Sequence, residues 1–90
     1  MLVLPARLTH EQAGPCARML VQALRSHAES TIVADAGALT HVDSSALAVL
    51  LECRRDAMVL GQSFSVSHLP ARLRELASLY GIASLLPAAP

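Results

Sequence analysis

The sequence predicts a small α/β domain in which helices alternate with the strands of a mainly parallel sheet. Short β-branched or alternating runs recur along the chain, and longer segments with helical periodicity separate them. The resulting order is β-α-β-α-β-α, which favours parallel pairing through right-handed crossovers. Ninety residues are enough for one domain, residues 1–90, without an internal linker or repeat.

The first half of the chain contains a strand, a helix and a second strand. Leu2–Leu4 is a short apolar run that ends at a proline, which cannot donate a hydrogen bond to a sheet. Thr9 and Gln12 fit a capping box. Apolar residues then recur at helical spacing as far as about His27. Thr31–Asp35 is β-branched and bounded by polar residues, so we expect it to be the central strand.

The helix predicted over residues 44–60 is the most apolar segment. It follows a predicted loop over 36–42 and precedes an alternating strand at Ser63–Ser67. Two of its faces are apolar, and periodicity does not say which one packs on the sheet. One face comprises Ala46, Val49, Leu50, Cys53 and Ala57, and the other comprises Leu47, Leu51 and Met58. A helix that is apolar on two sides is expected to be covered twice, by the sheet and by a partner.

The last third of the chain predicts one more helix and a short covering segment. Pro70 suits the first position of the helix, and Gly81 suits its C-terminal cap. Residues 82–86 are apolar and predict either a strand turn or a segment that covers the core. Residues 87–90 are expected to fray.

The composition argues against several function classes. Formal net charge is zero, only 2% of residues are aromatic, and no basic cluster exceeds the pair Arg54–Arg55, so we expect no nucleic-acid partner. The histidines are scattered and the glycines stand apart, so we expect no metal, nucleotide or other cofactor. The chain start does not resemble a signal peptide, and the longest apolar run is too short to cross a bilayer. These features predict a soluble cytoplasmic protein with reduced cysteines, at Cys16 and Cys53.

A polar segment, residues 40–45, leads into the apolar helix, and we call it the elbow. Asp43 or Ser44 is a natural N-cap, because a short side-chain oxygen there accepts a hydrogen bond from a free amide of the first turn. The elbow therefore holds a carboxylate and two hydroxyls at the positive end of a helix. It is either an ordinary cap or a site that a partner recognises. A hydrolase site built from His41, Asp43 and Ser44 or Ser45 is disfavoured, because near-consecutive residues seldom form a triad, so we expect no enzyme.

The elbow and the helix after it, residues 42–51, resemble the most specific part of a STAS domain, the family named for sulfate transporters and anti-sigma-factor antagonists. The run 76–87 is most similar to the MlaB-type subunit, a cytoplasmic component of the ABC transporter that moves phospholipids between the two membranes of a Gram-negative envelope. A typical member has a further strand before the one predicted at 2–4. The resemblance therefore implies an exposed sheet edge, which is either blunted or pairs with another chain, for instance in a homodimer.

The resemblance implies two uses for the elbow. In MlaB-type subunits the hydroxyl residue directly after the aspartate contacts the ATPase subunit, and that residue is Ser44 here. In anti-sigma-factor antagonists the next residue, Ser45 here, is phosphorylated by a partner kinase. The first hypothesis is thus a non-catalytic subunit that binds and stabilises the ATPase of a phospholipid-transport ABC system, at the inner membrane through that partner. The alternative is an anti-sigma-factor antagonist that phosphorylation of Ser45 switches. The expected partner-binding residues are Asp43, Ser44, Ser45, Leu47, Leu51, Arg54 and Arg55.

Overall fold

Three parallel strands form the main sheet, in the spatial order β1-β3-β5. The computed structural model describes residues 1–26 and 29–89. In it β3 (Thr31–Asp35) lies between β1 (Leu2–Val3) and β5 (Ser63–Ser67), and every pair of neighbouring strands is parallel. The α/β class, the parallel sheet and the central position of residues 31–35 are therefore confirmed.

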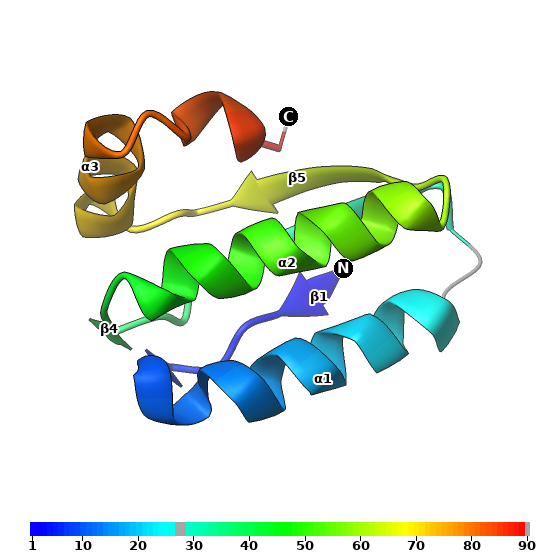
Figure 1. Ribbon diagram of the computed structural model, residues 1–90, viewed down its shortest axis with the longest axis horizontal. Coiled ribbons are helices and arrows are strands. Elements are labelled where there is room, and N and C mark those ends of the chain that lie inside the picture. The colour runs from blue at the N-terminus through cyan, green and yellow to red at the C-terminus, as the bar shows by residue number, and fades with distance from the viewer. Residues whose placement is uncertain (27–28, 90) are drawn as a thin grey trace.

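Two long helices run side by side across one face of this sheet (Figure 1). They are α1 (His10–Ser26) and α2 (Ser45–Val59). Each strand of the main sheet lies next to the one that follows it in the order β1-β3-β5, and crossovers between parallel strands share one hand as a rule, which accounts for the placement of both helices on the same face. The shorter α3 (Ala71–Leu79) follows β5, and the 3-10 helix η1 (Ala83–Leu85) leads the chain back along the outer side of β5 (Figure 1). The helix end expected at His27 lies outside the described residues.

The core shows which face of α2 packs on the sheet. All five residues of the first predicted face are buried: Ala46, Val49, Leu50, Cys53 and Ala57. The second face is divided. Leu47 is only 2% exposed, Leu51 is half-buried, and Met58 is 56% exposed. Leu47 therefore belongs to the buried core, together with the residues of the first face.

A second, smaller sheet was missed by the sequence patterns. It consists of two parallel strands, β2 (Arg7–Leu8) and β4 (His41–Val42), the latter within a segment predicted as loop. The amides of Thr40 and His41 both donate to the carbonyl oxygen of Ala6, at 2.8 and 3.1 Å. Two-residue strands are too short to show an alternating pattern, so only their long-range pairing reveals them. This sheet fixes the elbow beside the start of α1.

The C-terminal segment differs from the prediction. The Val66 amide donates to the Pro87 carbonyl at 2.8 Å, and the Ala89 amide donates to the Val66 carbonyl at 2.9 Å. Backbone hydrogen bonds thus connect residues 87–89, part of the tail expected to fray, to the outer edge of β5, and residue 90 lies outside the described residues. Leu86 is 6% exposed, so the preceding segment covers the core. No helix in the described part of the chain has the length and apolar character needed to span a membrane.

Candidate functional site

Asp43 connects the starts of two helices. Its Oδ1 accepts a hydrogen bond from the Ser45 amide at 2.8 Å, and its Oδ2 accepts one from the His10 amide at 3.1 Å. Ser45 and His10 are the first residues of α2 and α1, so one carboxylate lies at the positive ends of two helix dipoles. The predicted capping role is confirmed for Asp43. Ser44 directly precedes α2, but its side chain makes no capping hydrogen bond.

The charge of Asp43 is stabilised in this position. Partial desolvation raises the pKa of the Asp43 carboxyl, but hydrogen bonds from Ser45 and His10 outweigh that effect and hold the pKa below its ordinary value. The His10 imidazole adds a further contact, with Nδ1 lying 3.5 Å from Asp43 Oδ2. The elbow therefore presents a carboxylate that remains ionised and is held by backbone amides.

The start of α1 is fixed by its own cap. Gln12 Oε1 accepts hydrogen bonds from the Thr9 amide at 3.0 Å and from the Thr9 hydroxyl at 2.8 Å. This is one half of the predicted capping box, since the Gln12 amide donates to the Thr9 carbonyl oxygen and not to its hydroxyl. The cap sets the direction in which α1 begins, and hence the position of the His10 amide near Asp43.

The two elbow serines differ in accessibility. Ser44 is exposed, whereas Ser45 is half-buried and its side chain helps to hold the pKa of Asp43 low. A partner that approaches the elbow meets the Ser44 hydroxyl first. A kinase that modified Ser45 would have to place a phosphate group next to the Asp43 carboxylate.

An exposed stripe continues from the elbow along α2, and we call it the α2 stripe. Its members are spaced four, three, four and three residues apart, so they lie on one side of the helix. They are Ser44, Ala48, Leu51, Arg55 and Met58. All are exposed except Leu51, which is half-buried, and Arg55 forms an ion pair with Glu52. The stripe is small and polar at the elbow, and larger and more apolar towards the far end.

The predicted contact residues do not all reach this surface. Asp43, Ser44 and Ser45 form the elbow, and Leu51 and Arg55 lie on the stripe. Arg54 is half-buried at the flank of the helix. The structure corrects the prediction that Leu47 binds a partner, because its side chain is packed in the core and is not available on this surface.

A second carboxylate, that of Asp35, lies at the carboxyl end of β3. Asp35, at the end of β3, accepts a hydrogen bond from the Gly37 amide at 2.9 Å, and His68 Nδ1 lies 3.4 Å from the same oxygen. The Gly37 hydrogen bond, together with His68, lowers the pKa of Asp35. Sequence reasoning missed this pair. A carboxylate at the last position of the strand, two residues before a glycine, was the available signal, but His68 is 33 residues away.

The hydrolase arrangement weighed from the sequence does not form. His41 Nδ1 lies 3.0 Å from the Thr40 hydroxyl, while Asp43 contacts His10. Within residues 1–26 and 29–89, no three His, Cys, Asp or Glu side chains gather as metal ligands would. Cys16 and Cys53 are both free and buried, and burial raises the pKa of Cys53 to about 12. A thiol with such a pKa is a poor nucleophile at neutral pH.

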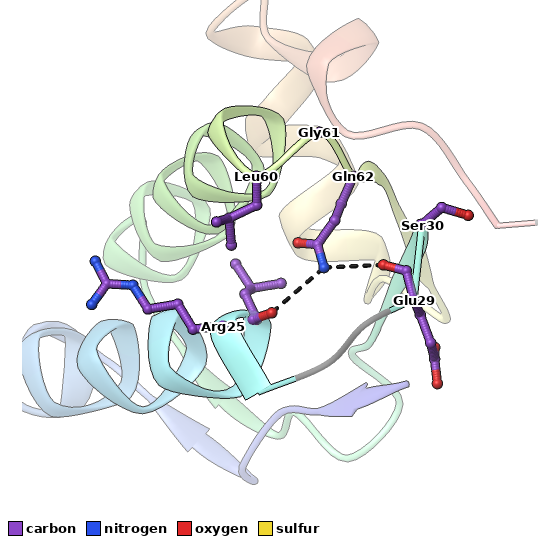
Figure 2. A pocket seen from close by; sticks show the side chains of 7 residues that line it. Arg25, Glu29, Ser30, Leu60, Gly61 and Gln62 are labelled. Carbon is purple, nitrogen blue, oxygen red and sulfur yellow. Dashed lines mark hydrogen bonds between the residues drawn. The ribbon is translucent and has the colours of Figure 1, made fainter.

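A hollow of about 290 Å³ lies at the opposite end of α2. Figure 2 shows Gln62 pointing between the end of α1 and the start of β3. Its Nε2 donates to the Glu29 carbonyl oxygen at 3.0 Å and, more weakly, to the Leu24 carbonyl oxygen at 3.5 Å. The Leu24 carbonyl is in the last turn of α1, so this side chain helps to cap that helix. We assign Gln62 a structural role.

Comparisons with known proteins agree with this architecture. A family model described as Mlab, STAS domain matches residues 1–87. Among solved structures, the anti-sigma factor antagonist SpoIIAA in its unphosphorylated form superposes with a TM-score of 0.75 at 18% sequence identity. That match covers 98% of this chain and 76% of SpoIIAA. A comparison with curated proteins finds no match. With a family model that spans nearly its whole length and the same fold in a solved relative, the chain belongs to the STAS domain family.

Proposed function

We propose that the chain is a non-catalytic subunit that binds and stabilises the ATPase of a phospholipid-transport ABC system and so helps to maintain envelope lipid asymmetry. The observation that carries the proposal is the Mlab description of the family model over residues 1–87. In this role the protein sits at the cytoplasmic side of the inner membrane through its partner.

The surface best suited to the contact is the elbow with the α2 stripe. The elbow is rigid, because Asp43 ties the first amides of α1 and α2 together. A preformed surface loses little conformational freedom on binding, which favours affinity. The stripe adds apolar area at Leu51 and Met58 and a charged rim at Arg55, the mixture expected of an interface.

The proposed mechanism is preferential binding. A subunit without catalytic groups changes an ATPase only if it binds one conformation of it more tightly than another. The joined starts of α1 and α2 provide a surface that keeps its shape while the ATPase changes. The chain would thereby favour the assembled ATPase.

The test is a pull-down from the native cytoplasm and inner membrane, with captured proteins identified by mass spectrometry. Wild type is expected to recover an ABC ATPase. Ser44→Glu is expected to recover at least tenfold less of that ATPase, because the substitution places a charge inside the contact. Ser84→Glu is the matched control, since Ser84 is an exposed serine on η1, away from the elbow. Equal recovery of the ATPase by Ser44→Glu and Ser84→Glu would show that the contact does not lie at the elbow. Absence of any ABC ATPase in the wild-type sample would refute the proposal.

The alternative function is an anti-sigma-factor antagonist switched by phosphorylation of Ser45. SpoIIAA, the protein in the structural match, is an anti-sigma factor antagonist, although a match at 18% identity supports only a shared fold. Phosphate on Ser45 would add about −1.5 to −2 charges beside the ionised Asp43, so its main effect would fall on partner docking. Recovery of a serine kinase in place of an ATPase, with phosphate on Ser45, would establish this alternative.

A further inference from the structure

Two hollows adjoin each other beneath the C-terminal segment, away from the elbow and the α2 stripe. The wider one, about 320 Å³, lies beside the end of β5 and is bordered by Val66, His68 and Ala88. The narrower one, about 200 Å³, lies between α3 and η1 and is bordered by Ala77, Ser78, Ala83 and Leu86. Leu69 and Arg74 border both hollows, so the two lie next to each other, and we call them together the depression.

Arg74, an exposed residue of α3, supplies the positive charge of this depression. Among the described residues, none forms an ion pair or a hydrogen bond with its guanidinium group. The neighbouring His68 imidazole is engaged with Asp35, at 3.4 Å. The walls of the narrow hollow are otherwise mostly apolar, with Ser78 as the polar exception. An apolar recess beside an uncompensated cation is complementary to an anion that carries an apolar group.

We propose that this depression binds a small organic carboxylate with a short apolar tail. The carboxylate accepts hydrogen bonds from Arg74 in the wider hollow, because guanidinium and carboxylate groups pair in a bidentate manner. The tail occupies the narrower hollow against Ala77, Ala83 and Leu86. A volume of about 200 Å³ suits one ring or a short alkyl chain, since a cavity of about 150 Å³ can hold benzene.

The C-terminal segment forms one side of the site. The Val66–Pro87 and Ala89–Val66 hydrogen bonds hold it against β5, at 2.8 and 2.9 Å. Leu86 anchors the same segment in the core and also borders the narrow hollow. A ligand in the depression therefore contacts both α3 and the returning chain, and its binding stabilises their association.

The test is a titration of the isolated chain with sodium octanoate at constant ionic strength and pH 8, followed by amide chemical shifts. Saturable shifts are expected at Leu69, Ala77, Ala83 and Ala88. Arg74→Gln is expected to weaken binding at least tenfold, because it removes the charge-assisted pair with the carboxylate. Arg72→Gln is the matched control, because Arg72 is exposed on the same helix and borders neither hollow.

Three outcomes would overturn the inference. Octanol that binds as tightly as octanoate would show that the charge of Arg74 has no part. Equal losses in Arg74→Gln and Arg72→Gln would indicate non-specific attraction. Octanoate shifts confined to the exposed end of α2, residues 58–60, would place the ligand elsewhere. Because the titration contains no ATPase, its result is independent of the proposed transport function.

Discussion

Asp43 accepts hydrogen bonds from the first amides of both α1 and α2, and this double contact shapes the whole elbow. An ordinary N-cap satisfies amides of one helix. Here the second oxygen satisfies a helix that begins 33 residues earlier, at His10. Removing the carboxylate thus affects the elbow and the position of α1 together.

The first prediction concerns this shared cap. Asp43→Ala is expected to lower the melting temperature by roughly 5–10 °C, because two helix starts lose a capping acceptor. Thermal unfolding followed by circular dichroism measures the change. Ser44→Ala serves as the control and should leave the melting temperature nearly unchanged, since the Ser44 side chain caps nothing. Equal changes in melting temperature for Asp43→Ala and Ser44→Ala would show that capping by Asp43 does not stabilise the fold.

The second prediction concerns pH. The folded protein lowers the pKa of Asp43, so the ionised carboxylate stabilises the fold at pH values above its unfolded pKa of about 4. That contribution is lost as the pH falls through the still lower folded pKa. The melting-temperature difference between wild type and Asp43→Ala should therefore be at its largest at pH 6 and should shrink as the pH falls below about 4. A difference that stays constant over this range would contradict the electrostatic explanation.

At the scale of elements, α2 shows what the sequence could and could not predict. Helical periodicity identified two apolar faces, and burial confirms the face that contains Leu50. Periodicity could not place Leu47, because its burial depends on where α1 packs. The longer strands and helices were predictable from local patterns. The β2–β4 sheet and the Asp35–His68 pair were not, because both arise only from long-range contacts.

The third prediction separates the two faces of α2. Leu50→Ala is expected to lower the free energy of unfolding by about 3 kcal/mol, because it leaves a cavity in a fully buried site. Met58→Ala should change it by no more than about 0.5 kcal/mol, since Met58 is 56% exposed. Urea unfolding measures both values. A large loss in Met58→Ala would mean that the α2 stripe is covered within this chain and is not free for a partner.

At the scale of the whole molecule, the sheet has two edges of different character. The β1 edge is two residues long, and short edges resist pairing with other chains. The five-residue β5 would be a better template, but residues 87–89 interrupt its outer edge by pairing with Val66 at its middle. A homodimer, one of the two outcomes expected for an exposed sheet edge, would have to use the β1 edge. The C-terminal segment thus hinders pairing of the outer edge of β5 with another chain.

The last prediction tests that protection. Ala89→Pro removes the amide that donates to the Val66 carbonyl, whereas Ala89→Ser keeps it. In Ala89→Pro, hydrogen exchange at the Val66 amide is expected to accelerate about fivefold, which corresponds to the loss of roughly 1 kcal/mol from one hydrogen bond. Sedimentation velocity should then show self-association that grows with concentration, because the middle of the outer edge of β5, at Val66, is uncovered. Ala89→Ser should behave as wild type in both measurements. Faster exchange without self-association would show that the C-terminal segment has separated from β5. It would also contradict the idea that this segment prevents self-association.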